Sequence, residues 1–318
     1  MAKTLAPGKM YRPTAMEINS ADDTLYVVEQ YNHRVSKWNY TAGLFDFTLD
    51  PTWGSNGNGT TGNPGRPTAD DDTNLNFPTG IAQNAPSDFL FVSDTLNHRI
   101  RVLLKSTGEF VDSIGSPGRG DGQLYRPAHL DDNDATGDLA IADSANHRIS
   151  VFENSGAFNF TGIATPPAEG FHTPWGVKHN TTNSEFYYSD VIRGKMYSYD
   201  DTGLIPSTPI SFGTPGTDTK DPNQLFYPGS SNGSTPTSGS SWLSDTRNNE
   251  IKEYTDLGQI AQKIAGAGTG DGQLYWPQHT TGFSNGGTGY LCVCNTLNNR
   301  IEVYERVFGG FETNFGSP

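Results

Sequence analysis

The sequence predicts an all-β protein, a six-bladed β-propeller built from four-stranded antiparallel blades. One observation is a seven-residue motif that recurs at 29–35, 94–100, 143–149, 190–196, 245–251 and 295–301. Another is a proline that precedes each copy at a similar distance, at Pro13, Pro78, Pro127, Pro174, Pro228 and Pro277. Two unrelated features with one period of about fifty residues indicate six repeats, each as long as a four-stranded propeller blade.

Composition agrees with many short strands joined by turns. The 318 residues are 33% hydrophobic, and 37 Gly and 20 Pro are spread along the chain together with many Asn, Asp, Ser and Thr. Turn residues distributed in this way favour short strands over disorder. We expect one propeller over residues 1–318, with an insertion at 51–76 and blades at about 10–60, 76–120, 125–170, 172–220, 226–270 and 275–318.

Each repeat divides into four strands, here called a to d. Strand a follows the proline, as in 78–82, and strand b is the apolar run that ends at the motif, as in 89–92 and 139–142. Strand c begins at the basic residue and carries apolar residues of both parities, such as Ile100 and Leu103, which suits blades covered on both faces. Strand d is less regular, as in 110–115 and 311–315, and residues 2–6 are candidates for ring closure.

The repeated motif predicts a hairpin between strands b and c. Four residues separate Asp94 from Arg99, so the acid and the base should stand opposite each other as a cross-strand ion pair. Asn97 is expected to take the left-handed turn conformation, and Asp94 to accept turn amides. Because the arrangement is repeated around the ring, it indicates a scaffold rather than a catalytic site. The other expected hairpin pairs are Glu29/Arg34, Asp143/Arg148, Asp190/Lys195 and Asn295/Arg300.

Blade five departs from this pattern. Asp245 should face Glu250, and like charges directly opposite each other are unfavourable. Arg247 in the turn is the expected compensating charge. A divalent cation bound by Asp245 and Glu250 is the alternative, because paired carboxylates suit hard cations.

The repeated motif and the connectors between repeats resemble those of a known family. Asn-His-Arg-Ile at 146–149 follows an acid-terminated strand, and the connectors at 120–124 and 270–274 both read Gly-Asp-Gly-Gln-Leu. These features resemble the NHL-repeat family of β-propellers over residues 8–316, with blades four and five degenerate. The resemblance implies a fold rather than a function, because such propellers serve many tasks.

The loop-rich face is the first candidate binding site. The b–c turns and the d–a connectors of a propeller emerge on one face, which is where recognition loops usually lie. The candidate binding residues there are Asp70, Asp71, Asp72, Asp121 and Asp271. The alternative interpretation is that 120–122 and 270–272 are tight turns with solubilising charge.

The central channel is the second candidate. His129 and His279 share one position of strand a in blades three and six, so both should line the channel. Some six-bladed propellers, such as the peptide-amidating lyases, hold a metal in the channel with a histidine cluster, so the resemblance makes a channel metal one possible expectation here. His179 has the opposite parity, however, and a catalytic zinc usually needs three protein ligands. No cofactor is predicted, with a divalent cation in the channel as the alternative to a polar lining hydrogen-bonded to water.

Charge and hydropathy exclude several partners. A net charge of −14 and a pI near 4.8 oppose binding to nucleic acid. No run approaches 18 apolar residues and no apolar leader is visible, so we expect no membrane insertion and a chain that is cytoplasmic or incorporated into a virion. Cys292 and Cys294 are expected to be free thiols.

The expected function follows from these points. No nucleophile elbow, zinc-protease motif or phosphate loop occurs. The leading hypothesis is a non-catalytic scaffold that binds protein or glycan through the loop-rich face. A variant is a structural or adhesion component of a larger assembly, such as a virion, a surface appendage or a homo-oligomer. The alternative is a metal-dependent lyase or hydrolase with its site at the central channel.

Overall fold

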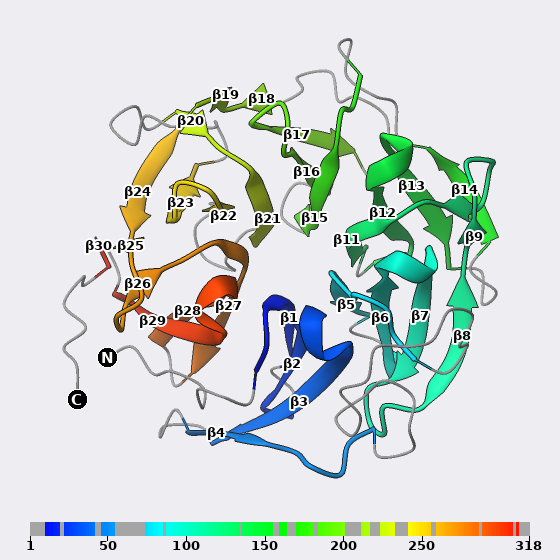
Figure 1. The fold of residues 1–318 in the computed structure, drawn as a ribbon, viewed down its shortest axis with the longest axis horizontal. Coiled ribbons are helices and arrows are strands. Elements are labelled where there is room, and N and C mark those ends of the chain that lie inside the picture. The colour runs from blue at the N-terminus through cyan, green and yellow to red at the C-terminus, as the bar shows by residue number, and fades with distance from the viewer. Residues whose placement is uncertain are drawn as a thin grey trace.

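The chain folds as a ring of antiparallel sheets around a central axis, where the sequence predicts the channel (Figure 1). The structure, a computed structural model, describes residues 10–19, 22–41, 46–54, 74–84, 87–133, 135–154, 159–163, 170–180, 184–200, 211–216, 223–232, 241–255, 259–285, 288–307 and 310–311. Within these residues, six four-stranded sheets have the strand order of the sequence from channel to rim. The predicted six-bladed propeller is therefore confirmed.

The first three blades follow one another in chain order. Blade one comprises β1 (Pro13–Asn19), β2 (Thr24–Glu29), β3 (Arg34–Thr41) and β4 (Asp46–Leu49). Blade two comprises β5 (Ile81–Gln83), β6 (Phe89–Asp94), β7 (Arg99–Leu104) and β8 (Phe110–Ile114). Blade three comprises β11 (Pro127–Asp132), β12 (Leu139–Asp143), β13 (Arg148–Glu153) and β14 (Asn159–Ile163).

The last three blades complete the ring. Blade four comprises β15 (Pro174–Asn180), β16 (Glu185–Asp190), β17 (Lys195–Asp200) and β18 (Ser211–Phe212). Blade five comprises β21 (Pro228–Asn232), β22 (Ser241–Asp245), β23 (Glu250–Tyr254) and β24 (Ile260–Ile264). Blade six comprises β27 (Pro277–Asn285), β28 (Thr288–Asn295), β29 (Arg300–Val307) and β30 (Gly310–Phe311).

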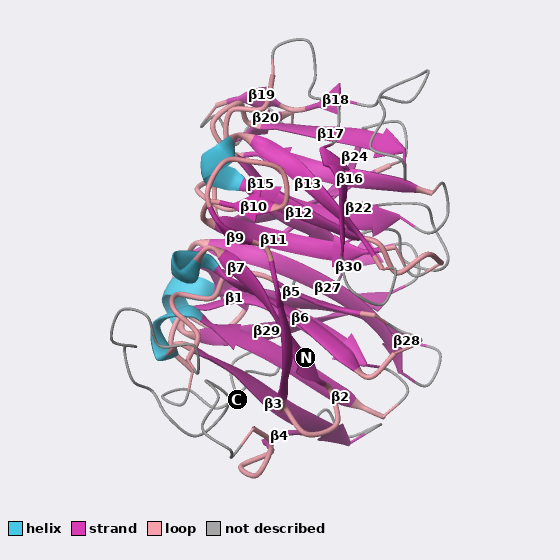
Figure 2. Ribbon diagram, turned by 90° about the vertical axis from the view of Figure 1, so that its right-hand side faces the viewer, coloured by secondary structure: helices cyan, strands magenta, loops and turns pink. Residues whose placement is uncertain are grey.

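Short elements join the blades on one face. The b–c turns of blades one, two, three and six form single-turn 3₁₀ helices, η1 (Gln30–Asn32), η2 (Thr95–Asn97), η3 (Ser144–Asn146) and η4 (Thr296–Asn298). Figure 2 shows these helices together on one face of the ring. The connectors form short parallel pairs, β9 (Ser116–Pro117) with β10 (Gln123–Leu124), β19 (Thr214–Pro215) with β20 (Gln224–Leu225), and β25 (Gly266–Ala267) with β26 (Gln273–Leu274). None of the described helices is long and apolar enough to cross a membrane.

The hydrophobic core lies between neighbouring blades. Ile100 and Leu103, which have opposite parity on β7, are both fully buried, as the predicted two-faced strand requires. Leu103 packs in one cluster with Tyr26 and Val28 of blade one, whereas Ile100 packs in another with Leu139 of blade three. Burying such side chains is the main favourable term in folding, and here each blade buries them only through its neighbours.

Blade six closes the ring against blade one. Trp38 of β3 and Cys292 of β28 belong to one buried cluster, and Thr296 donates a hydrogen bond of 2.7 Å to the carbonyl oxygen of Pro13. Cys292 and Cys294 are free and buried, and burial raises the pKa of the Cys292 thiol. The expected closure segment 2–6 and most of the expected last strand, 312–315, lie outside the described residues.

Candidate binding face at the mouth of the channel

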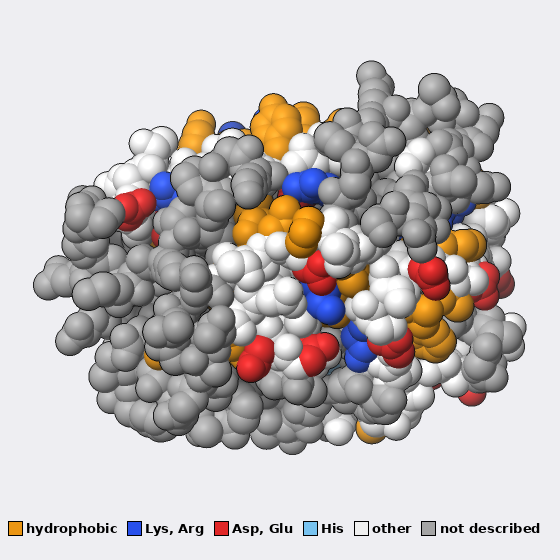
Figure 3. Space-filling model, turned by 90° about the horizontal axis from the view of Figure 1, so that it is seen from below, with side chains coloured by type: hydrophobic (Ala, Val, Ile, Leu, Met, Phe, Trp, Pro, Cys, Tyr) orange, Lys and Arg blue, Asp and Glu red, His pale blue; other side chains and the backbone are white. Residues whose placement is uncertain are grey.

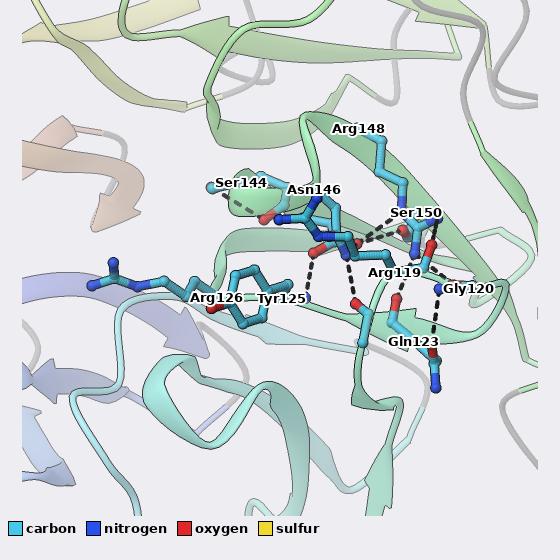
Figure 4. A network of polar contacts seen from close by, with 12 residues as sticks. Arg119, Gly120, Gln123, Tyr125, Arg126, Ser144, Asn146, Arg148 and Ser150 are labelled. Carbon is cyan, nitrogen blue, oxygen red and sulfur yellow. Dashed lines mark hydrogen bonds and ion pairs between the residues drawn. The ribbon is translucent and has the colours of Figure 1, made fainter.

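The b–c hairpin of blade three shows what the repeated motif builds (Figure 4). Asp143 and Arg148 stand opposite each other in register, and Arg148 Nε donates to Asp143 Oδ2 at 2.8 Å. The carboxylate is fully buried, and it also accepts hydrogen bonds from Asn146 Nδ2 at 2.8 Å and from the backbone amide of Tyr125 at 2.7 Å. The pair is therefore part of a buried network that connects the hairpin to the residues just before strand a.

The other predicted pairs share this cross-strand register. Glu29 lies 3.0 Å from Arg34, and Asp94 lies 2.9 Å from Arg99. In blade four Asp190 stands opposite Lys195 in register, and Arg193 Nε lies 3.8 Å from Asp190 Oδ2.

Blade six moves the carboxylate to strand c. Asn295 stands opposite Arg300, and Arg300 Nη2 contacts Glu302 Oε1 at 2.6 Å. Asn295 Nδ2 donates to Glu302 at 3.4 Å. Burial raises the pKa of Glu302, against the opposing effect of Arg300.

The left-handed residue of the turn is not the predicted one. His98, at φ 57°, takes that conformation, whereas Asn97 is the last residue of η2 and donates to both carboxylate oxygens of Asp94 at 3.0 and 2.9 Å. The prediction for Asn97 was wrong because its amide is needed inside the turn. The left-handed residues at this position are His33, His98, His147, Gly194, Asn249 and Asn299.

The side chain at this left-handed position links consecutive blades. His33 Nδ1 accepts the amide of Phe77 at 3.1 Å, and His98 Nδ1 accepts the amide of Arg126 at 3.0 Å. Asn299 Oδ1 accepts the amide of Arg12 at 2.9 Å, which carries the pattern across the ring closure. We call this contact the blade latch. Sequence reasoning missed it, although only His, Asn and Gly occupy the position.

The first residue of the motif fixes a second amide near the same place. The amide held by this residue belongs to the second residue before the strand-a proline, as for Tyr125 on Asp143, Phe226 on Asp245 at 2.8 Å and Tyr275 on Asn295 at 2.8 Å. The two residues before each proline are thus held by their own blade and, where the latch forms, by the preceding one. We call them the mouth dipeptides: 11–12, 76–77, 125–126, 172–173, 226–227 and 275–276.

The mouth dipeptides are mostly aromatic residues and arginines. Tyr11, Tyr125 and Tyr275 are among the most exposed large hydrophobic side chains of the described chain. Hydrophobic side chains project along the upper rim of Figure 3, the edge that corresponds to the face seen in Figure 1. The second residue has a positive φ at Arg12, Phe77, Arg126, Tyr227 and Trp276. Such backbone costs about 1–3 kcal/mol per residue and is concentrated at functional sites.

A pocket opens among the mouth dipeptides of blades five and six. Its walls include the rings of Trp175, Tyr227 and Trp276, with Thr246 and Gln278 as polar neighbours, and its volume is about 110 Å³. Trp175 and Gln278 directly follow strand-a prolines, so the pocket lies where the channel meets the face of the b–c turns.

Blade five neutralises its buried acid from a different position. Lys252 is fully buried and its Nζ lies 2.6 Å from Asp245 Oδ2 and 3.8 Å from Glu250 Oε2, while Lys263 lies 3.3 Å from Glu250. The expectation that Arg247 compensates Asp245 was wrong. Arg247 instead lies over aromatic rings, 5.5 Å from the Trp276 centroid, because Lys252 on strand c already reaches the carboxylate.

The two predicted channel histidines do face each other. The rings of His129 and His279 are parallel within 1°, with centroids 5.5 Å apart, and both side chains are buried. Burial lowers the pKa of His129 to about 3, and burial together with His129 lowers the pKa of His279. Both imidazoles are therefore neutral, and His129 Nε2 and His279 Nδ1 meet no hydrogen-bond partner among the described residues.

A charged bridge lies on the same inner strands. Lys178 Nζ lies 3.0 Å from Asp131 and 3.5 Å from Glu17, so it joins blades four, three and one. Burial opposes the charge of Lys178, but the carboxylates of Asp131 and Glu17 raise its pKa. The bridge keeps an ammonium ion, rather than a free amine, beside the channel.

The histidine pair does not fit a catalytic metal centre. Within the described ranges, no group of three His, Cys, Asp or Glu side chains is arranged to hold a metal ion. His179, the remaining candidate, packs its ring 4.8 Å from that of Phe186. Two imidazoles fall short of the three protein ligands of a catalytic zinc, so no reaction step is derived through a metal here.

Asp121 and Asp271 are not among the residues that line the pocket. Asp271 contacts Arg300 Nη1 at 3.6 Å, and Asp121 is exposed on the corresponding connector of blade three. In both connectors a glutamine side chain caps the turn, as where Gln123 Oε1 accepts the amide of Gly120 at 2.8 Å. Asp70, Asp71 and Asp72 lie outside the described residues. Two mouth-dipeptide residues, Tyr227 and Trp276, line the pocket, whereas Asp121 and Asp271 do not.

Comparisons with known proteins agree with the fold. A family model for the NHL repeat matches residues 75–103. Protein brain tumor of Drosophila melanogaster is 35% identical over 82 residues, which are 26% of this chain and only 8% of that protein.

Solved structures resemble the chain over nearly its whole length. A streptogramin B lyase aligns with a TM-score of 0.61 at 14% identity, covering 96% of this chain and 98% of that one. An auxiliary nutrient binding protein from Bacteroides thetaiotaomicron aligns with a TM-score of 0.67 at 10% identity, covering 94% and 70%. An enzyme and a binding protein share this fold, so the likeness concerns the fold alone. The chain is thus a six-bladed β-propeller with an NHL repeat matched at residues 75–103, in blade two.

Proposed function

We propose that this propeller is a non-catalytic binding module, which recognises a protein or a glycan through the mouth dipeptides. The observation that carries the proposal is a set of exposed aromatic side chains held in place by buried polar groups around an open pocket. Aromatic and arginine side chains dominate the energetics of binding surfaces, and rigid presentation lowers the entropy cost of binding. The auxiliary nutrient binding protein from Bacteroides thetaiotaomicron, which has a similar fold, is by its name also a binding protein.

A binding selection followed by mutation tests this proposal. The protein would be screened against a displayed random peptide library and a glycan array, and any ligand would be measured with Trp276→Ala and Tyr125→Ala variants. We expect at least one of the two variants to lose about tenfold or more in affinity, as for a central contact residue. Ile163→Ala is the matched control, because Ile163 is a similarly exposed apolar side chain on the outer strand β14. Unchanged affinity in both mouth variants would overturn the proposal.

The module also has a surface suited to a larger assembly. The outer strand β8 exposes the apolar side chains of Phe110 and Val111, and exposed apolar edge strands favour association. We propose on this basis that the propeller works within an assembly of several chains, of the kind found in virions or surface appendages. Sedimentation velocity over a wide concentration range tests self-association, and a monomer at every concentration would argue against it.

A metal-dependent lyase or hydrolase is the competing proposal. Its one support is a pair of buried ring nitrogens, at His129 and His279, that meet no hydrogen-bond partner in the described part of the chain. Elemental analysis of the purified protein separates the two proposals. A stoichiometric metal that disappears in the His129→Ala, His279→Ala variant would favour the enzyme, and no bound metal would remove it.

A further inference from the structure

The pocket at the mouth is small and almost entirely apolar. Its volume of about 110 Å³ is well below the roughly 300–1,000 Å³ of pockets that enclose a whole small molecule. Trp175, Tyr227 and Trp276 supply three aromatic walls, whereas Thr246 and Gln278 supply the polar side chains. A pocket of this size and lining suits one apolar side chain of a larger ligand.

The backbone around the pocket is fixed before any ligand arrives. Tyr227 and Trp276 have positive φ values of 57° and 59°, and the amide of Trp276 is held by Asn249 Oδ1 at 2.7 Å. Gly229 is required beneath them, because a Cβ there would lie 2.3 Å from the carbonyl oxygen of Gln278. Preformed walls favour binding because little side-chain or loop entropy is lost on association.

Arg247 places a positive charge beside these aromatic walls. Its guanidinium lies 4.5 Å from the ring centroid of Phe226, 5.6 Å from Tyr227 and 5.5 Å from Trp276. The residue is exposed, and its guanidinium makes no ion pair with an acid among the described residues. By contrast, Arg148 in blade three forms an ion pair with the buried carboxylate of Asp143. Arg247 is therefore free to meet a carboxylate, which a planar guanidinium recognises in two-point fashion.

We propose that this pocket binds a peptide segment of a partner protein that carries an apolar side chain next to a carboxylate. The apolar side chain enters the space between Trp175, Tyr227 and Trp276, and the carboxylate meets Arg247. The proposal rests on the proposed binding function and names its ligand class. A sugar ring is disfavoured because few polar groups converge on the pocket, and a basic segment is disfavoured by the guanidinium at its edge.

Matched small probes test the proposal directly. N-acetyl-L-leucine has the apolar side chain and the carboxylate, whereas N-acetyl-L-leucinamide lacks only the charge. Dissociation constants would be measured by NMR titration of the wild-type protein, with affinities expected in about the millimolar range for ligands of this size. We expect the acid to bind about fivefold more tightly than the amide, which is the upper range for an exposed ion pair.

Variants assign the two parts of the recognition. Arg247→Gln should bring the acid down to the affinity of the amide while the amide itself still binds, and Trp276→Ala should weaken both probes. Arg119→Gln is the matched control, because Arg119 is also exposed and lies over an aromatic ring, that of Tyr125, in another blade. It should leave the preference for the acid unchanged. The unfolding midpoint of each variant would show that the fold is intact.

Three outcomes would overturn the inference. Equal affinity for acid and amide, or a preference that survives in Arg247→Gln, would remove the carboxylate contact. Binding of N-acetylglucosamine in place of the leucine probes would show a glycan site. Any of these three results would leave the wider binding function standing if ligands from the library screen still depended on the mouth residues. Failure of this inference is therefore distinguishable from failure of the proposed binding function.

Discussion

The first three blades and the last two build the same turn from different residues. Blades one to three place an acid and an arginine opposite each other and use histidine at the latch position, as in Asp143, Arg148 and His147. Blade five uses Asp245, Lys252 and Asn249, and blade six uses Asn295, Arg300, Glu302 and Asn299. What stays constant is a hydrogen-bond acceptor at the first position and a left-handed residue at the fifth.

The basic side chain that pairs with the buried acid comes from different positions in blades three and five, yet in both blades it also contacts the connector. Arg148 Nη2 donates to the carbonyl oxygen of Gln123 at 2.6 Å, and Lys252 Nζ donates to that of Gln224 at 2.6 Å. Each thus joins the buried acid to the connector, although one lies two residues further along strand c than the other. The route through Lys252 leaves the turn residue Arg247 free beside the pocket. The motif therefore diverges in the half of the ring where the candidate binding pocket lies.

Of the substitutions considered, removal of Lys252 from blade five should lower the free energy of unfolding the most. Lys252→Met leaves Asp245 fully buried without its counter-charge, which should lower the free energy of unfolding by about 3–5 kcal/mol. Urea denaturation measures this change. Lys263→Met, which removes a partly exposed lysine near the same turn, should cost under about 1 kcal/mol.

A second variant protects this prediction if Lys252→Met does not fold. Asp245→Asn combined with Lys252→Met removes both charges and should recover part of the loss, because a neutral amide retains an acceptor for Phe226. A cost below about 1 kcal/mol for Lys252→Met alone would mean that another group compensates Asp245.

A lysine at the blade-three position equivalent to Lys252 should partly compensate for the loss of Arg148. Arg148→Met removes the partner of Asp143 and should cost about 2–4 kcal/mol, somewhat less than in blade five because Arg148 is 12% exposed. Adding Ser150→Lys places an ammonium at the position equivalent to Lys252 and should restore at least half of the loss in urea denaturation. No recovery in the double variant would show that the two blades are not interchangeable here.

These differences mark how far the sequence could lead. The period of the prolines and of the motif predicted the six blades, and the shared phase of His129 and His279 predicted that both face the channel. Lys252 was missed because it is the diagonal neighbour of Asp245, two residues along strand c from the directly opposed Glu250. The mouth dipeptides were missed because their role comes from latches between blades, and single-repeat spacing does not encode those contacts.

The latch of blade two should tolerate the residue that blades five and six use. His98→Asn keeps an acceptor and a residue that accepts the left-handed conformation, so it should cost under about 0.5 kcal/mol. His98→Ala loses both, and should cost about 1–2 kcal/mol in the free energy of unfolding. Equal costs for the two variants would mean that the contact with the amide of Arg126 contributes nothing.

Titration should separate histidine latches from asparagine latches, with the smallest effect. Burial and Arg126 lower the pKa of His98, which fits its role as a neutral acceptor in the folded state. The unfolded chain then binds the proton more readily, so the stabilisation is complete above a pH of about 6.5 and is lost as the pH falls below it. The loss should stay below about 1 kcal/mol, because the imidazole is partly exposed to solvent.

The pair His98→Asn and Asn249→His makes this test symmetrical. Unfolding free energies at pH 7.5 and pH 5.5 should show a smaller pH dependence than wild type for His98→Asn, since asparagine does not titrate. Asn249→His should show a larger one, because it adds a titrating acceptor for the amide of Trp276. Protonation of the new histidine in Asn249→His would remove the acceptor that holds the amide of Trp276, a wall of the pocket. Binding of N-acetyl-L-leucine should therefore weaken at pH 5.5 in Asn249→His alone. A pH dependence unchanged by either substitution would mean that the latch residue does not need to be neutral.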